Sequence, residues 1–159
     1  MTEGRSGNLK KIRVLIVDDS ATLREGLTSL CALLSELEVV GTASDGVEAL
    51  DAIRNLKPDV VSLDIRMPRM NGIEVLKAIQ RDRLSCTPII LSGLADEFSR
   101  EKCLELGAKY VFDKSTELEK FLQVLELSHK HRRKFPAETS SCARKRAGPA
   151  GKLRRKPMD

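Results

Sequence analysis

Short apolar runs alternate along the chain with segments whose apolar residues recur every three or four positions. The first run, residues 12–17, reads IRVLIV and is apolar on both faces, as is typical of a strand covered on both sides. A leucine-rich segment at helical spacing follows it, up to Ser35. Four more such pairs complete the pattern. Their strands are expected at residues 39–43, in the run that ends at Asp64, at residues 89–91 and at residues 110–112.

Polar residues at capping positions support the helix that follows each run. Ser20 fits the N-cap of the first helix, and Gly107 is placed to stop the fourth. The other three helix starts have the spacing of a capping box, at Asp45–Glu48, Asn71–Glu74 and Thr116–Glu119. Five strand–helix units in strict alternation predict an α/β fold, in which a doubly wound parallel sheet, (βα)5, is covered by helices on both faces.

The charge is divided unevenly along the chain. Residues 129–159 hold eleven Lys or Arg against two acidic residues, a net charge of +9, whereas residues 1–128 have a net charge of −4. We therefore expect a flexible leader at residues 1–10, a folded domain at residues 11–128 and a basic, disordered tail after it. Such a tail is either inert or a contact for nucleic acid, anionic lipid or an acidic protein.

Composition excludes several classes of protein. No run approaches the roughly 18 apolar residues of a membrane span, and the start lacks the apolar core of a secretory signal. The four cysteines have no paired spacing, which indicates buried small side chains in a reducing compartment rather than disulfides or a zinc site. The sequence therefore predicts a cytoplasmic protein.

Polar residues end four of the five expected strands. They are Asp18 and Asp19 after the first strand, Asp64 after the third, Ser92 after the fourth and Lys114 after the fifth. In a parallel sheet these strand ends share one edge, where ligands bind. Crowded carboxylates repel one another, and Mg²⁺ would relieve that repulsion while keeping positions for phosphate oxygens. Because Asp also accepts phosphoryl groups, and Lys and Ser donate to their oxygens, the pattern favours a site for metal and phosphoryl group.

Each of these positions also has an ordinary structural interpretation. A single Asp after a strand is most often a turn residue or a helix cap, as Asp19 would be for the first helix. Ser92 fits an ordinary loop serine, and Lys114 fits a solvated surface lysine. Their joint placement at one edge of the sheet favours the site over these separate interpretations.

Four motifs resemble the receiver domain of two-component response regulators. They are the Asp pair after IRVLIV, the stretch DIRMPRMNG, the Ser-Gly after IIL and the Lys that ends YVFDK, in the family's order and spacing over about residues 11–127. The resemblance, to a stand-alone receiver, implies a flavodoxin-like fold with strand order 2-1-3-4-5. It also implies three kinds of partner, namely a sensor histidine kinase, a histidine phosphotransfer protein and a downstream target protein.

The resemblance gives the acidic residues their roles. Asp64 would accept the phosphoryl group from a phosphohistidine of the kinase. Asp19 and Asp64, together with the backbone carbonyl of Arg66, would hold Mg²⁺, and Asp18 would assist through water. Phosphorylation would then control contact with a partner protein, so that the chain signals without an external substrate and is not an enzyme.

Ser92 and Lys114 complete the site, and two positions near the lysine depart from the family's pattern. Ser92 would contact the phosphoryl group and move on activation, and Lys114 would pair with that group. The aromatic switch residue usual three positions before the lysine is here Val111, and strand alternation directs the flanking aromatic side chains to the other face. Ser115 replaces the commoner proline after the lysine, so no cis-proline loop is expected.

Two further hypotheses concern the lifetime of the phosphorylated state and the kind of function that the protein has. Arg66 and Leu94 occupy the positions that tune water access in this family, and their bulk implies slow self-dephosphorylation. The alternatives to a phosphorylated signalling module are a phosphorylation-independent adaptor and a nucleic-acid-associated regulator acting through the basic tail. A hydrolytic enzyme is disfavoured because the nucleophile would hold its own phosphate and no separate substrate-binding loop is evident.

Overall fold

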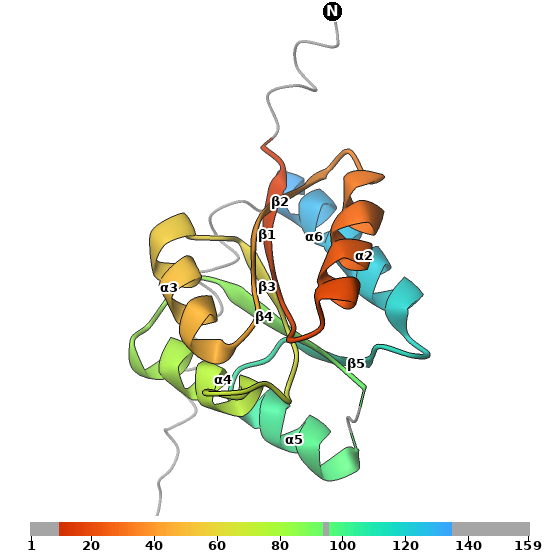
Figure 1. Ribbon diagram of the computed structural model, residues 1–159. Coiled ribbons are helices and arrows are strands. Elements are labelled where there is room, and N and C mark those ends of the chain that lie inside the picture. The colour runs from red at the N-terminus through yellow and green to blue at the C-terminus, as the bar shows by residue number, and fades with distance from the viewer. Residues whose placement is uncertain (1–9, 94–95, 135–159) are drawn as a thin grey trace, which may run out of the picture.

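Five strands and five helices alternate in the computed structural model, which describes residues 10–93 and 96–134 (Figure 1). The strands are β1 (Ile12–Val17), β2 (Leu37–Ala43), β3 (Val60–Leu63), β4 (Thr87–Ser92) and β5 (Tyr110–Asp113). The helices are α2 (Ala21–Ala32), α3 (Gly46–Leu56), α4 (Gly72–Arg81), α5 (Glu97–Glu105) and α6 (Leu118–Lys134). The predicted alternation of strand and helix is confirmed.

All five strands are parallel and form one sheet in the order β2-β1-β3-β4-β5. In the middle of the sheet, Val14 of β1 lies opposite Val39 on one side and Val60 on the other. The register of β1 with β2 shifts by one residue after Val14, because Leu15 pairs with Gly41. The doubly wound α/β fold and the order implied by the receiver resemblance are therefore both confirmed.

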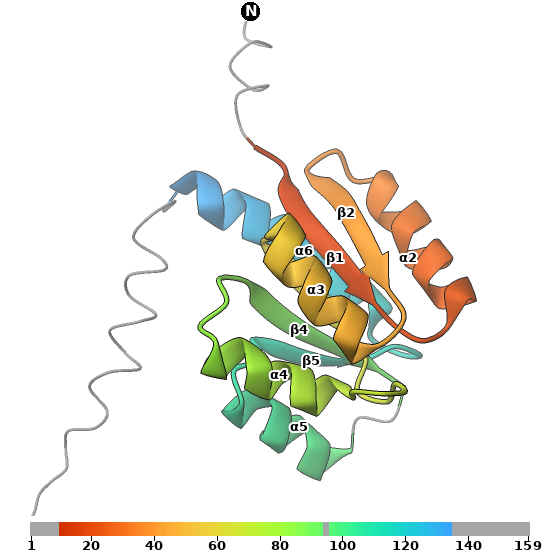
Figure 2. The same cartoon turned by 60° about the vertical axis from the view of Figure 1, so that its left-hand side comes forward.

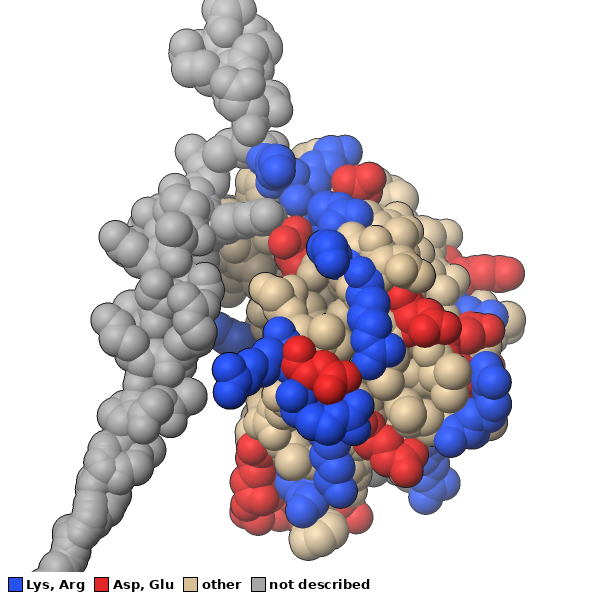
Figure 3. All heavy atoms as spheres, turned by 90° about the vertical axis from the view of Figure 1, so that its left-hand side faces the viewer, with Lys and Arg blue, Asp and Glu red and all other residues tan. Residues whose placement is uncertain are grey.

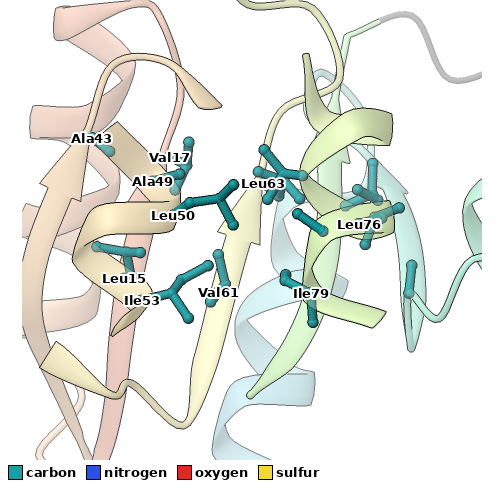
Figure 4. Close-up of a cluster of buried hydrophobic side chains, with 14 of the residues drawn as sticks. Leu15, Val17, Ala43, Ala49, Leu50, Ile53, Val61, Leu63, Leu76 and Ile79 are labelled. Carbon is teal, nitrogen blue, oxygen red and sulfur yellow. The ribbon is translucent and has the colours of Figure 1, made fainter. Parts of the chain in front are cut away.

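Helices cover both faces of the sheet, and each face has its own apolar core (Figure 2). On one face, α3, α4 and α5 cover alternate strand residues such as Leu15 and Leu63 (Figure 4). On the other face, α2 and α6 cover the intervening residues, with Phe121 fully buried at the centre. The inner strands β1, β3 and β4 are buried on both surfaces nearly throughout, which requires them to be apolar on both faces.

Two of the predicted helix starts are confirmed by their hydrogen bonds. The Ser20 side chain accepts the backbone N–H of Leu23 at the start of α2. At the start of α4, Asn71 and Glu74 form a complete capping box, each side chain accepting the other residue's backbone N–H at 2.9 Å. These polar caps satisfy donors that the first helical turn leaves unpaired.

The helix start predicted at Asp45 is also confirmed, but the reciprocal hydrogen bonds of the other two predicted capping boxes do not form. Asp45 does cap α3, but the Glu48 carboxylate accepts the N–H of Ser44 at 2.9 Å instead of the N–H of Asp45. Among the described residues, Thr116 and Glu119 form no hydrogen bond with each other. Helix α6 begins two residues after Thr116, and other side chains hold the preceding turn.

Helix α6 continues to Lys134, past residue 128, where the sequence places the end of the folded domain. His129, expected in the tail, is instead buried within this helix. The leader and the remainder of the tail lie outside the described residues, so the prediction that they are disordered stays a prediction. Among the described helices, none is both long and apolar enough to cross a membrane.

The described cysteines largely behave as the sequence predicts. Cys31 and Cys103 are buried in the two cores, Cys86 is half-buried, and none of these three is bonded to another. Burial raises the pKa of the Cys31 thiol to about 11, which keeps it protonated and unreactive. Cys142 lies outside the described residues.

Over the outer side of α3 and α4, basic and acidic side chains are interspersed (Figure 3). One contact between the two helices is the ion pair of Arg54 with Asp82, whose nitrogen and oxygen atoms are 2.9 Å apart. This face is therefore an ordinary solvated surface that carries both signs of charge. It differs in this from the end of the sheet, where carboxylates gather and two of them are buried.

Candidate functional site

The predicted site residues meet at one edge of the sheet, where the strands end. Asp18 and Asp64 directly follow β1 and β3, and Ser92 is the last residue of β4. The backbone N–H of Asp64 donates to the carbonyl of Val17 at 3.0 Å, which continues the ladder between the two strands past β3. Sheet pairing therefore sets the positions of the two carboxylates before any side-chain contact is made.

Three carboxylates form a compact acidic cluster at this edge. One ligand oxygen from each of Asp18, Asp19 and Asp64 lies within 4.8 Å of the others. Asp18 is 2% exposed and Asp64 is 5% exposed, whereas Asp19 faces solvent. The cluster thus has a buried floor and one open side from which an ion or a phosphoryl group can approach.

Lys114 supplies the positive charge of the site. Its Nζ lies 2.6 Å from Oδ2 of Asp18 and 3.7 Å from Oδ2 of Asp64. The backbone N–H of Lys114 donates to the carbonyl of Ser92 at 3.0 Å, which ties this residue to the end of β4. The buried Ser92 is therefore next to the lysine, as the sequence predicts, although in this structure the ammonium pairs most closely with Asp18.

Asp18 is held by several contacts besides the lysine. Its Oδ1 accepts the backbone N–H of Ser20 at 2.9 Å, so both carboxylate oxygens have partners. Its backbone carbonyl accepts Nη1 of Arg24 at 2.7 Å. Arg24 was not among the residues predicted from the sequence, because an arginine on the first turns of a helix carries no signal that it reaches back to a strand end.

The environment of Asp64 favours its protonated form. Burial, and then the charge of Asp18, raise the pKa of Asp64 from 3.8 to about 6. Lys114 opposes this rise, and Asp19 adds a smaller increase. A divalent cation would favour the ionised carboxylate by neutralising its neighbours, so the cluster fits a hard cation such as Mg²⁺.

The β3–α4 loop, residues 64–71, borders the cluster on one side and is held against its neighbours by backbone contacts. Gly72 donates its N–H to the carbonyl of Ile65 at 2.8 Å. Gly46 donates to the carbonyl of Met70 at 3.0 Å, which joins the loop to α3. Arg66 lies exposed in this loop, two residues after Asp64.

A side-chain contact adds to the backbone contacts of the β3–α4 loop. Arg69, whose φ of 66° lies in the left-handed region, donates from Nε and Nη2 to one oxygen of Asp45 at 3.0 and 2.8 Å. The N–H of Glu48 and the Arg69 guanidinium lower the pKa of Asp45. The sequence analysis found Asp45 only as a helix cap.

The β5–α6 loop, residues 114–117, borders the cluster on the other side and is held by side chains as well as by backbone hydrogen bonds. Glu117 accepts the N–H of Asp113 at 2.9 Å, and Asp113 in turn accepts the N–H and hydroxyl of Ser115. Arg100 on α5 donates to the carbonyl of Val111 at 2.8 Å and pairs with Glu117 at 3.3 Å. Sequence reasoning missed Arg100 and Glu117, which are seventeen residues apart and meet only in the folded chain.

The predicted departures at β5 are confirmed. Val111 is buried on the α3–α5 side of the sheet, while Phe112 packs on the opposite side against Phe121. The ring of Tyr110 stacks on that of Phe112 at 5.7 Å between centroids, so it also belongs to the far face. The peptide bonds of the described residues are all trans, including that between Lys114 and Ser115.

The arrangement suits phosphoryl transfer to a carboxylate. An acidic cluster can hold a divalent cation, and the ammonium of Lys114 can pair with phosphoryl oxygens. Both features neutralise charge in a reaction whose catalysis consists mostly of positioning and electrostatic stabilisation.

Known proteins are similar to this chain in both sequence and fold. The family model of the response regulator receiver domain matches residues 14–126. The protein-glutamate methylesterase/protein-glutamine glutaminase of Lawsonia intracellularis is 47% identical over 98 residues, which are 60% of this chain and 27% of that protein. The protein of the same name from Pyrococcus abyssi is 45% identical over 101 residues, 62% of this chain and again 27% of the relative. The chain therefore spans about a quarter of the length of these two relatives.

Solved structures give the same result. The response regulator domain of Thermotoga maritima CheB has a TM-score of 0.69 and 32% identity, covering 76% of this chain and 98% of that one. A chain of the CheX-CheY-BeF3-Mg²⁺ complex from Borrelia burgdorferi has a TM-score of 0.64 and 33% identity, covering 72% and 90%. With the family match extending over most of the chain and over every residue of the acidic cluster, the protein belongs to the response regulator receiver domain family.

Proposed function

We propose that this receiver accepts a phosphoryl group on Asp64 from the phosphohistidine of a sensor histidine kinase. The observation that carries the proposal is the buried carboxylate of Asp64, close to two other carboxylates and to Nζ of Lys114. This carboxylate lies at the end of a strand, where the open side of the cluster admits a donor. Because the phosphohistidine of such a kinase faces the cytoplasm, we propose that the reaction takes place there.

Bound Mg²⁺ would neutralise the carboxylates and the phosphoryl oxygens. Asp19 and Asp64 would hold it with the backbone carbonyl of Arg66, and Asp18 would assist through water. Asp18 also keeps Lys114 within 2.6 Å, which places the ammonium beside the acceptor before the phosphoryl group arrives. Ser92 would donate its hydroxyl to a phosphoryl oxygen, while Lys114 pairs with another.

The proposed output is a contact with another protein that depends on phosphorylation. A histidine phosphotransfer protein or a downstream target would be the partner. The chain would hydrolyse its own aspartyl-phosphate slowly and act on no external substrate. The methylesterase activity named for the relatives is not proposed here, since only about a quarter of their length is matched.

Intact-mass spectrometry after incubation with acetyl phosphate and Mg²⁺ tests the proposal. We expect a gain of one phosphoryl group that requires Mg²⁺ and is lost in Asp64→Asn. Asp51→Asn, which changes an exposed carboxylate on α3, is the matched control and should still gain the group. No gain, either with acetyl phosphate or with a cognate kinase, would contradict the proposal and favour the phosphorylation-independent adaptor.

The lifetime of the phosphorylated state stays a prediction from the sequence. Arg66 is exposed beside the cluster, and Leu94 lies outside the described residues. We expect slow self-dephosphorylation because bulky side chains at these two positions restrict the attacking water. A phosphorylated half-life no longer than that of an Arg66→Ala, Leu94→Ala double variant would count against this expectation.

A second candidate function rests on the +9 charge of residues 129–159. A basic segment binds nucleic acid through phosphate contacts, and such binding weakens steeply with salt. Binding of a DNA duplex should then fall with rising salt and weaken strongly when the chain is truncated after Lys134, which removes seven of the eleven basic residues. Binding that is absent, or unchanged by the truncation, would exclude this candidate.

A further inference from the structure

The side chain of Arg100 joins three elements beside the phosphoacceptor site. It belongs to α5 and is 33% exposed, so solvent screens it only in part. Nη1 donates to the carbonyl of Val111 in β5 at 2.8 Å, and Nη2 lies 3.3 Å from Oε1 of Glu117, which directly precedes α6. One guanidinium therefore connects α5, β5 and the β5–α6 loop.

Glu117 extends this connection to the segment that carries Lys114. The same Oε1 that meets Arg100 accepts the backbone N–H of Asp113 at 2.9 Å. The carbonyl of Asp113 accepts the backbone N–H of Glu117 at 2.7 Å, which closes a tight turn with Lys114 inside it. A displacement of the Lys114 backbone would thus reach the Glu117 carboxylate through the neighbouring residue, Asp113.

At its other end the turn reaches the acidic cluster. Nζ of Lys114 lies 2.6 Å from Asp18 and 3.7 Å from Asp64. A phosphoryl group on Asp64 would bring new anionic oxygens within reach of this ammonium and draw it from Asp18. The contacts therefore lead from Asp64 to Lys114, along the chain to Asp113, and from Asp113 through Glu117 to Arg100.

The side chain of residue 111 is unsuited to making this link. Val111 is a short aliphatic residue, buried in the core under α3, α4 and α5, with no polar atom and no ring to swing. The polar contact that α5 makes with this part of β5 is instead the hydrogen bond from Arg100 to the backbone carbonyl. A backbone acceptor is present whatever the side chain, so the contact suits a strand without an aromatic switch.

We propose that Arg100 and Glu117 are positioning residues that couple Lys114 to helix α5. When the phosphoryl group on Asp64 draws the lysine, the β5–α6 loop shifts, and Glu117 and Arg100 carry the shift to α5. This inference rests on the proposed function, since it needs a phosphoryl group at Asp64. It adds the route by which occupation of the site changes a helix at the protein surface.

Hydrogen exchange measured by mass spectrometry tests the coupling, with Mg²⁺ present and with or without beryllofluoride as the phosphoryl mimic. In the unsubstituted protein we expect the exchange rate of α5 amides to change by about fivefold or more, the lower end of allosteric coupling. Arg100→Met should reduce that change to within error, while acetyl phosphate still adds one phosphoryl group at Asp64. The two readouts separate the coupling from the phosphorylation itself.

Three further variants keep the test decisive. Glu117→Gln retains Oε1 as an acceptor for both donors and should preserve the α5 response. Arg100→Lys keeps the charge but reaches one of the two acceptors, so it should give a reduced response even if Arg100→Met is poorly folded. Arg54→Met removes the exposed ion pair with Asp82 and should leave the response unchanged.

The possible failures differ in what they overturn. If Arg100→Met keeps the full α5 response, or if α5 of the unsubstituted protein does not respond although it is phosphorylated, the coupling is wrong and the proposed function stands. If Arg100→Met keeps the folded circular dichroism spectrum and yet is not phosphorylated, Arg100 serves the site and the coupling is again wrong. If the unsubstituted protein gains no phosphoryl group from any donor, the proposed function fails first.

Discussion

The two loops that border the acidic cluster are held in different ways. In the β3–α4 loop, main-chain groups meet at close range, and a Cβ added at Gly72 would lie 2.3 Å from the carbonyl oxygen of Asp64. The β5–α6 loop also has backbone hydrogen bonds, such as that from Glu117 to Asp113. The side chains of Arg100, Glu117 and Ser115 add further contacts to it. The first loop thus leaves no space for a methyl group at Gly72, whereas the second depends in part on side chains that can rotate.

This difference indicates a division of labour at the site. Tightly packed backbone cannot shift by small amounts without clashes, so the β3–α4 loop keeps the phosphoacceptor and the proposed metal ligands fixed. Side-chain hydrogen bonds can lengthen or exchange partners at small cost, so the β5–α6 loop can follow Lys114. Substitutions in the two loops should therefore differ in size and in kind.

The largest effect is expected in the fixed loop, for Gly72→Ala. The added methyl group would meet the carbonyl oxygen of Asp64 and the Cα of Ile65, both of them backbone atoms. We expect the free energy of unfolding to fall by about 3 kcal/mol, the upper part of the range for overpacking. Urea unfolding followed by circular dichroism measures it.

Gly26→Ala is the matched control for that substitution. It adds the same methyl group inside α2, where nothing lies within 4 Å. Alanine is the better helix former, so stability should rise by about 0.5–1 kcal/mol. Equal losses for the two variants would show that Gly72 is not specially constrained.

The next effect concerns the carboxylate between the two loops. Because the pKa of Asp64 is raised to about 6, the folded chain keeps a proton that the unfolded chain releases near pH 4. Without Mg²⁺, the contribution of this group to stability is therefore lost as pH rises from about 4 through about 6. At pH 7, Asp64→Asn should increase the free energy of unfolding by about 2 kcal/mol, and its stability should depend less on pH over this range.

Urea unfolding at several pH values between 4 and 7 checks this prediction. Added Mg²⁺ should stabilise the unsubstituted protein and reduce the advantage of Asp64→Asn, because the ion favours the carboxylate form. Parallel stability curves for the two proteins in the absence of Mg²⁺ would contradict the raised pKa.

A smaller effect is expected for the side chain that supports the fixed loop. Arg69→Met removes both hydrogen bonds to Asp45 and leaves the backbone contacts in place. We expect Mg²⁺ binding to weaken by about tenfold, the usual lower size for a residue that orients metal ligands without touching the metal. Isothermal titration calorimetry measures the Mg²⁺ affinity. Arg81→Met is the control, because Arg81 pairs with Asp82 at the end of α4 that lies away from the loop. Identical weakening in both variants would point to net charge alone.

The smallest effect is expected in the adjustable loop, for Ser115→Ala. The hydroxyl of Ser115 donates to Asp113 at 2.6 Å, but its backbone N–H donates to the same oxygen at 2.8 Å and remains after the substitution. We expect no measurable change in the urea midpoint or in Mg²⁺ affinity. A clear loss of either would show that this loop is as constrained as the β3–α4 loop.

Much of this fold is predictable because the relevant signals are local. A strand buried on both faces is apolar at nearly every position, and residues 12–17 show this in the sequence itself, with Arg13 as the exception. The capping box at Asn71 and Glu74 also lies within one helical turn. The box predicted at Thr116 does not form because helix α6 begins at Leu118, one residue later than a cap at Thr116 requires. Glu117, which precedes the helix, is held by Asp113 and by Arg100 from another helix.

The order of residues along the chain is enough to predict the alternation of strands and helices and the aliphatic residue at position 111. It also predicts that one edge of the sheet gathers the polar residues Asp18, Asp64, Ser92 and Lys114. Parallel strands must bring their carboxyl ends together, so these results follow from order along the chain. The folded chain was needed to see that Lys114 lies closest to Asp18, that Arg69 supports one loop and that Arg100 supports the other. The partners of long charged side chains depend on how distant elements pack, and spacing along the sequence does not encode that packing.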